Sequence, residues 1–185
     1  CMLLEALRPR GLSARPAQPE DQGLLRDLFL CARPHLQSLP LPQAALAALI
    51  DQQYGFQQAG HQRRFPHASH LVVQAGDTPI GALTLHDSAA DLHIVDIVLA
   101  LAARGQGHGT ALLRWVQGSA AVLGRRVTLS VDATNPAAQR LYLRLGFSTL
   151  SADAIQFDMQ WQAPQQAGHA RTPPSMTSPE RQHTP

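Results

Sequence analysis

Lysine is absent from the 185 residues, so all 15 permanently basic side chains are arginines. These arginines are scattered and the formal net charge is only +2, which argues against nucleic-acid binding, because such proteins usually gather their cations on one face. Cysteine is nearly absent too: Cys1 and Cys31 provide neither a disulfide framework nor a cysteine-rich metal site. We therefore expect no metal and a reducing, cytoplasmic location. No apolar run is long enough to span a bilayer, so we expect no membrane partner either.

One domain accounts for most of the chain. Hydrophobic residues make up 44% and charged residues 15% of the sequence, a balance typical of a globular domain. We place this domain at residues 11–161, after a short N-terminal extension at residues 1–10. From residue 162 the composition shifts to Pro, Gln, Ser and Thr with little to bury, which predicts a disordered tail over residues 162–185.

Hydrophobic periodicity assigns the elements of the domain. Helical spacing of apolar side chains, with Pro or Gly near the ends, alternates with short aliphatic and β-branched runs typical of strands. The run at 91–100 is long and mostly aliphatic, as expected for a central strand. We predict strands at 11–15, 70–76, 79–87, 91–100 and 126–133, helices at about 18–34, 42–58, 111–124 and 135–146, a loop at 63–69 and a closing hairpin at 147–161.

A glycine-rich turn lies between the strand at 91–100 and the helix at 111–124, and reads RGQGHGT over residues 104–110. Glycines let backbone amides approach a ligand closely, and a helix N-terminus attracts anions, so the turn suits a pyrophosphate. A plain helix start with flexible glycines is the alternative interpretation. A Walker A loop needs the lysine that the chain lacks, and a dinucleotide-binding fingerprint needs a third glycine where Thr110 stands.

Two motifs resemble those of the GNAT acetyltransferase superfamily. Arg104-x-x-Gly107-x-Gly109 matches its (Gln/Arg)-x-x-Gly-x-(Gly/Ala) motif, and NPAAQRLYLRLGF over residues 135–147 resembles its Asn…Tyr-x-x-x-Gly-Phe segment. The order of the expected elements also fits. The resemblance implies a mixed α/β (α+β) fold with a central, mostly antiparallel sheet flanked by helices. Its two central strands, at 91–100 and 126–133, would be parallel and splayed.

The resemblance further implies a site for acetyl-CoA as co-substrate. The backbone of Val98 and Leu99 would pair with the pantetheine arm. Asn135 would contact that arm where the central strands splay, and Tyr142 would protonate the leaving thiolate. Arg104 opens the motif. The amides that would hold the pyrophosphate are those of Gly105, Gln106, Gly107, His108, Gly109 and Thr110.

The family pattern does not supply the general base here. Many members carry a glutamate on the strand before the Asn segment, and the comparable residue in this chain is Ser130. Asp96 is the first candidate, because a carboxylate within an apolar strand has a raised pKa that suits a base near neutral pH. His93 is the second, and strand alternation puts it on the opposite face from Asp96 unless a bulge intervenes. Water is the third.

Each candidate also has a plainer interpretation. Tyr142 fits a core aromatic on the apolar face of its helix, Asn135 fits an N-cap, and Asp96 fits a structural carboxylate. Arg63, Arg64 and the helix before them form either a wall of the acceptor site or an ordinary surface loop.

We therefore predict an acetyl-CoA-dependent N-acetyltransferase that moves the acetyl group to a primary amine by direct transfer in a ternary complex. The acceptor would be a small molecule or a protein amino group, and a homodimer is compatible with the family. Two alternatives stay open. A non-catalytic acyl-CoA-binding sensor or interaction module would bind without turnover, which the serine at position 130 favours. A nucleotide-binding regulatory domain would use the glycine-rich turn for ATP or NAD.

Overall fold

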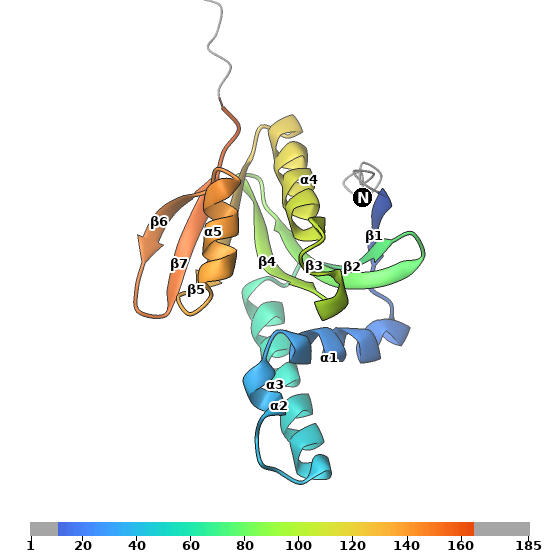
Figure 1. The fold of residues 1–185 in the computed structure, drawn as a ribbon. Helices are drawn as coiled ribbons and strands as arrows, with labels where there is room; N and C mark the ends of the chain where they lie inside the picture. Colours follow the sequence, from blue (N-terminus) through green and yellow to red (C-terminus); the bar gives the residue numbers. More distant parts are fainter. Residues whose placement is uncertain (1–10, 165–185) are drawn as a thin grey trace, which may run out of the picture.

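The computed structural model describes residues 11–164, which form a seven-stranded sheet flanked by helices (Figure 1). The strand order is β1-β2-β3-β4-β5-β7-β6, and neighbours are antiparallel except for β4 and β5. The expected mixed fold with one parallel pair at its centre is therefore confirmed. The strands are β1 (Leu12–Pro16), β2 (Ser69–Ala75), β3 (Thr78–Asp87), β4 (Asp91–Leu99), β5 (Arg126–Asp132), β6 (Ser148–Ala152) and β7 (Gln156–Trp161).

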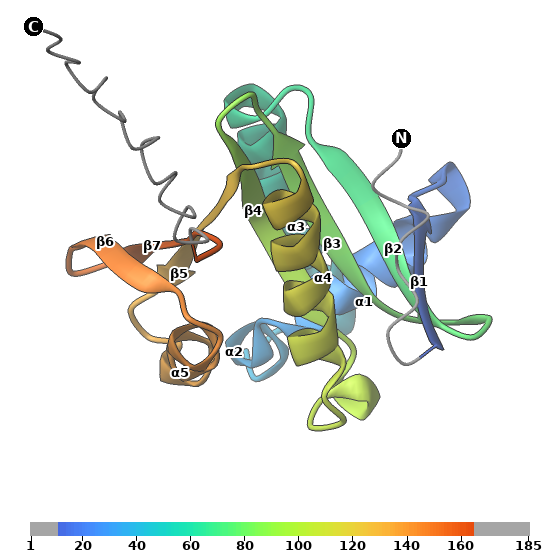
Figure 2. The same cartoon turned by 90° about the horizontal axis from the view of Figure 1, so that it is seen from above.

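Within the described residues, five α-helices cover the two faces of this sheet (Figure 2). Two of them, α4 and α5, share a core with one face, whereas α1 and α3 lie against the other and bury a separate, smaller cluster. None of these helices is both long and apolar enough to cross a membrane. The helices are α1 (Gln22–Cys31), α2 (Pro34–Gln37), α3 (Gln43–Arg64), α4 (His108–Val122) and α5 (Pro136–Arg144).

The larger core lies between the sheet and α4. Leu83 of β3 and Leu92 of β4 have no exposed surface. They belong to the same cluster as Leu112, Leu113 and Val116 of α4, which are buried as well. Burial of one such side chain stabilises a fold by about 1.5–3 kcal/mol. This packing fixes α4 on the sheet, and with it the glycine-rich turn at the N-terminus of the helix.

Two helical segments differ from the sequence prediction. α3 continues through Arg63 and Arg64, which we expected in a loop, because no proline interrupts the chain before Pro66. Pro34 does more than end a helix: it is the first residue of α2, a position where its fixed φ and missing N–H cost nothing. The segment before β2 is thus more helical than its sequence pattern indicated.

The parallel pair β4 and β5 is joined over only part of its length. Register partners run from Asp91 with Arg126 to Ile94 with Leu129, and they stop there. Beyond this point the carboxyl halves of the two strands separate, which confirms the predicted splay. An opening is thereby left in the middle of the sheet.

A β-bulge lies on β4 just where the separation begins. Leu85 of β3 pairs with Ile94. The adjacent residue, Thr84, pairs with Asp96, so β4 carries one extra residue at this point. A bulge reverses the alternation of side chains, and Asp96 therefore shares a face of the sheet with His93. The sequence placed these two residues on opposite faces unless a bulge intervenes, and a bulge does intervene.

The two terminal segments of the domain scheme were predicted from composition. The extension at residues 1–10 and the tail from residue 165 onward lie outside the described residues. Residues 162–164, where the predicted tail begins, carry no helix or strand.

Candidate active site

A groove of about 610 Å³ runs between the end of β4, the glycine-rich turn and α5. Two residues of the motif, Gln106 and His108, do not line it. The Gln106 side chain donates from Nε2 to the carbonyl of Ala102 at 2.6 Å and so braces the turn from within. The other predicted cofactor residues and Tyr142 all line the groove: Val98, Leu99, Arg104, Gly105, Gly107, Gly109, Thr110 and Asn135.

The glycine-rich turn has the backbone shape of an anion site. Gly105 and Gly107 have φ of 75° and 83°, in the left-handed region that side chains other than glycine rarely adopt. Gly107 is the N-cap of α4, and its carbonyl accepts the N–H of Ala111 at 3.0 Å, which starts the helix three residues earlier than predicted. The first amides of a helix lack helical partners and carry its positive dipole end. The turn therefore fits a pyrophosphate such as that of coenzyme A.

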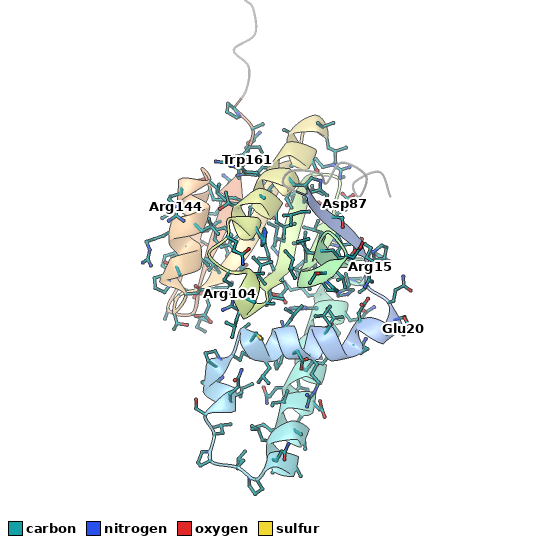
Figure 3. The ribbon with its side chains drawn as sticks, turned by 45° about the vertical axis from the view of Figure 1, so that its right-hand side comes forward. Arg15, Glu20, Asp87, Arg104, Arg144 and Trp161 are labelled. Carbon is teal, nitrogen blue, oxygen red and sulfur yellow. The ribbon has the colours of Figure 1, made fainter. Side chains whose placement is uncertain are left out.

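Arg104 acts on the protein backbone. Its Nε donates to the Leu99 carbonyl at 3.0 Å, and its Nη2 donates to the Cys31 carbonyl at the end of α1 at 3.3 Å. Figure 3 shows Arg104 in the region where the sheet meets α1. The side chain thus ties the glycine-rich turn to the end of β4 and to the end of α1, and it lines the groove.

The pairing of β4 with β3 shows which backbone groups of β4 face the splay. The N–H of Ala100 donates to the Ile80 carbonyl at 2.9 Å, so Ala100 directs its hydrogen-bonding groups to β3. These groups alternate along a strand, so those of Val98 also turn to β3. The N–H and C=O of Ile97 and Leu99 turn to the opposite side, where β5 has separated from β4. Of these four groups, the Leu99 carbonyl already accepts from Arg104 and the Ile97 N–H is hydrogen-bonded to the Asp96 carboxyl. The Ile97 carbonyl and the Leu99 N–H are therefore the backbone groups left for an extended ligand.

A small cavity of about 140 Å³ fills the splay between β4 and β5. Asn135 lines it and also caps α5, since its Oδ1 accepts the N–H of Ala138 at 3.1 Å. Tyr142 lines it from α5, with only 7% of its surface exposed, and packs against Phe147 with ring centroids 5.6 Å apart. Burial, and secondarily the charge of Asp96, raises the pKa of the Tyr142 hydroxyl to about 12. This phenol therefore keeps its proton at neutral pH.

Asp96 lines the same small cavity from the bulge of β4. Burial raises the pKa of its carboxyl, and the positive charges of His61 and Arg33 oppose that shift only in part. A carboxyl group held in this way takes up and releases a proton closer to neutral pH than an exposed one. The environment thus has the character expected of a general base.

His93 is occupied elsewhere. Its Nδ1 lies 2.9 Å from the Thr128 hydroxyl, and its ring stacks on Phe65 with centroids 4.9 Å apart. Burial is the main cause that lowers the pKa of His93. Although the bulge brings it to the same face as Asp96, it lines neither the groove nor the small cavity.

A second large cavity, of about 680 Å³, lies on the other side of the sheet, beneath α1 and α3. Asp96 lines this cavity as well as the small cavity in the splay. Ile97 lines both of these cavities and the groove. The three spaces therefore meet at the bulge of β4. The side chains of the large cavity that carry polar or aromatic groups are Gln18, Gln22, Phe29, Arg33, Tyr54, Gln57, Gln58, His70, Thr84 and Asp96.

Sequence reasoning missed most of the residues around this second cavity. They come from α1 and the segments on either side of it, from α3 and from the strands β2, β3 and β4. No short motif joins Arg33, Tyr54 and His70. A hydrogen bond of 3.2 Å between His70 Nδ1 and Thr84 Oγ1 is one of the contacts that the sequence could not indicate. Among residues 11–164, no three His, Cys, Asp or Glu side chains gather closely enough to hold a metal ion.

Solved structures share this architecture. The PaiA N-acetyltransferase of Thermoplasma acidophilum in complex with coenzyme A matches with a TM-score of 0.61 at 18% identity, over 82% of this chain and 98% of that one. The spermidine N-acetyltransferase of Vibrio cholerae in complex with CoA and spermine matches with a TM-score of 0.58 at 16% identity, over 83% and 96%. Naa50 of Arabidopsis thaliana in complex with the bisubstrate analogue CoA-Ac-MVNAL matches with a TM-score of 0.54 at 16% identity, over 82% and 99%.

At these identities the structural likeness establishes the fold. The sequence itself matches the Acetyltransferase (GNAT) family over residues 32–147, more than half of the chain. The matched region contains β4 with its bulge, the glycine-rich turn, the splay and α5. On these grounds the chain belongs to the GNAT acetyltransferase family.

Proposed function

We propose that this chain is an N-acetyltransferase that joins the acetyl group of acetyl-CoA to a primary amine in a ternary complex. The observation that carries the proposal is the meeting of three spaces at β4. Asp96 and Tyr142 both line the small cavity in the splay, Asp96 also lines the cavity under α1 and α3, and Tyr142 also lines the groove. A base and an acid thus stand between two separate binding spaces.

The groove is the proposed seat of acetyl-CoA. The backbone amides of residues 105–110 would hold the pyrophosphate, because they lie in a turn that opens a helix. The Ile97 carbonyl and the Leu99 N–H, which face the splay, would pair with the pantetheine arm, and Val98 would contribute to the wall. The side-chain amide of Asn135 has donors left after its Oδ1 caps α5. The bound thioester supplies an activated acetyl group.

Asp96 and Tyr142 then divide the proton transfers. Asp96 takes a proton from the acceptor amine, which is a nucleophile only in its neutral form. Tyr142 gives its hydroxyl proton to the departing sulfur as the N–C bond forms and the C–S bond breaks. A phenol with a pKa of about 12 is protonated at neutral pH, so the Tyr142 hydroxyl carries the proton that it donates. The nitrogen loses its second proton as the neutral amide forms, and that proton restores the Tyr142 hydroxyl directly or through solvent, while Asp96 returns its proton to solvent.

The cavity beneath α1 and α3 is the proposed acceptor site. Its chemistry is mixed, with aromatic rings, glutamine amides and the Asp96 carboxyl. One structure of similar fold holds CoA and spermine and another holds the bisubstrate analogue CoA-Ac-MVNAL, so the fold alone does not choose the acceptor.

The non-catalytic alternative rests on Ser130. This side chain donates to Asp158 at 2.7 Å, and no carboxylate occupies its position on β5. However, Ser130 and Asp96 line the same small cavity, so Asp96 supplies from β4 the carboxyl group that Ser130 does not. We therefore favour the enzyme.

Calorimetric titration with acetyl-CoA, with ATP and NAD as controls, is the first test. We expect binding of acetyl-CoA alone, and its loss in Gly107→Trp. Gly124→Trp is the matched control, because Gly124 has a similar φ of 65° at the other end of α4. Thiol release across a library of primary amines then tests turnover. Failure of the native chain to bind acetyl-CoA would refute the proposal, and binding without turnover on any amine would favour the sensor.

A further inference from the structure

Two of the side chains that line the acceptor cavity carry a formal charge. They are Asp96 on β4 and Arg33, which follows α1. The rest of the wall among the described residues is apolar, aromatic, amide or hydroxyl, apart from His70, which is paired with Thr84. A ligand that fills this space therefore meets one negative and one positive position.

Arg33 keeps most of its hydrogen-bonding capacity. Its Nη1 donates to the Phe29 carbonyl at 3.3 Å, and its guanidinium lies 4.0 Å above the centre of the Phe29 ring. A guanidinium has five N–H donors, so several remain for a ligand. The four ion pairs within residues 11–164 use other arginines, namely Arg15, Arg26, Arg125 and Arg126.

The position of Arg33 is costly without an anionic partner. The side chain is half-buried, and burial lowers the pKa of its guanidinium while the charge of Asp96 opposes that shift. A partly desolvated cation is stabilised most by a carboxylate, whose two oxygens match the planar fork of arginine. Asp96 does not fill this role, because no ion pair joins it to Arg33 among the described residues.

We infer that the acceptor is a primary amine that also bears a carboxylate, as a free amino acid does, with its amine at Asp96 and its carboxylate at Arg33. The inference rests on the proposed function. Phe29 and Tyr54, packed edge to face with centroids 5.5 Å apart, line the same space and suit an apolar or aromatic side chain. A polyamine fits poorly, because it would bring additional positive charge beside Arg33.

Matched pairs of acceptors test the inference. Phenylalanine, leucine and methionine are each compared with their primary amides, which keep the amine and lose the carboxylate charge. With the native chain we expect kcat/KM for the free acids to exceed that for the amides by about tenfold or more, since charge-assisted hydrogen bonds are the strong ones. In Arg33→Gln, which keeps an amide donor for the Phe29 carbonyl, the preference should fall to about twofold or less, through KM.

Arg26→Gln is the matched control. Arg26 pairs with Asp51 outside the cavity walls, so the preference should be unchanged. Equal use of acids and amides by the native chain, or a preference that survives Arg33→Gln, would overturn the inference. Calorimetric titration of the N-acetylated acids and amides reads the same preference without turnover. The inference is thus decided even if no amine is acetylated, whereas the proposed function fails only when acetyl-CoA binding or turnover fails.

Discussion

Asp96 lies opposite Thr84 in the ladder between β3 and β4. Without the bulge, Asp96 would share the α4-facing side of the sheet with Ile94, two residues before it. The bulge that causes this pairing turns the carboxyl away from the core beneath α4 and toward the acceptor cavity. Thr84 lines that cavity beside it. One extra residue in a strand thus moves Asp96 from a buried core position to one that lines both the cavity in the splay and the cavity under α1 and α3.

Asp96→Asn should lower the activity without lowering the stability at neutral pH. Loss of the base should lower kcat/KM by about 10²–10⁴-fold, the usual contribution of general base catalysis. The pKa of Asp96 is raised above its unfolded value of 3.8, so the native state binds more protons than the unfolded state between the two pKa values. Native stability therefore falls as pH rises through this range, and the variant should lack that fall.

Urea unfolding of the native chain and of Asp96→Asn between pH 4 and pH 8 provides the measurement. We expect the variant to be at least as stable as the native chain at neutral pH. A variant that is less stable there, with full activity, would identify Asp96 as a structural carboxylate.

Tyr142→Phe should reduce kcat and leave the affinity for acetyl-CoA within about twofold, because the hydroxyl is needed for the proton and the ring for packing. The phenylalanine ring can keep the contact with Phe147, so the melting temperature should change little. Single-turnover thiol release and calorimetry check the two parts. Unchanged kcat with a lower melting temperature would show that Tyr142 is only a core aromatic.

Much of the site follows from short motifs, and the rest depends on register. The glycine-rich turn and the cap of α5 are local, because Gly107 and Asn135 are placed by the residues next to them. Asn135 caps α5 as the sequence predicted, and the glycine-rich turn lies between β4 and α4 as predicted, although α4 begins three residues early. The face occupied by Asp96 depends on pairing with a different strand. Sequence alternation alone cannot reveal a bulge, because the extra residue on β4 is identified only by its missing partner on β3.

The acceptor cavity illustrates the same limit at longer range. Arg33 reaches the cavity wall because α1 ends just before it, and Tyr54 does so because α3 packs beneath the sheet. Helical periodicity assigned these helices but could not say how they cross the strands. Sequence analysis offered the helix before Arg63 and Arg64 as a wall of the acceptor site, and that helix does line the cavity, although the two arginines do not. It could not say which individual side chains would face this space.

Gly81→Ala should destabilise the fold because β3 and β4 approach closely at this position. A Cβ at Gly81 would lie 2.4 Å from the Val98 carbonyl oxygen, a backbone atom that cannot move aside easily. We expect a loss of about 1–3 kcal/mol in the free energy of unfolding, as for other overpacked sites.

Gly118→Ala is the matched control for that substitution. Gly118 lies on α4 with nothing within 4 Å of its added Cβ, so alanine should stabilise the helix by about 0.5–1 kcal/mol. Denaturant unfolding of the two variants compares them. If Gly81→Ala were as stable as the native chain, β3 and β4 would have room for a Cβ at this position, and the predicted clash of 2.4 Å with the Val98 carbonyl oxygen would be wrong.

Asp21→Asn should weaken the start of α1, and with it one wall of the acceptor cavity. Both oxygens of Asp21 accept from Arg15, at 2.7 and 2.8 Å, and Oδ2 also accepts the N–H of Gln18 at 2.7 Å. The hydrogen bonds from Arg15 are the main cause that lowers the pKa of Asp21 from 3.8 to about 2. A lowered pKa means that the stabilisation is complete above pH 3.8 and is lost as the pH falls toward 2.

Unfolding curves for the native chain and Asp21→Asn at several pH values between 2 and 7 check this prediction. The native chain should be the more stable at neutral pH, and the gap should narrow in the acid range as Asp21 takes up its proton. Because Gln18 lines the acceptor cavity, the variant should also raise KM for the amine more than KM for acetyl-CoA. A gap that stays constant down to pH 2 would contradict the prediction. It would show that the charge of Asp21 makes no contribution and that the amide of asparagine is a poorer partner for Arg15 and Gln18 than even a protonated carboxyl.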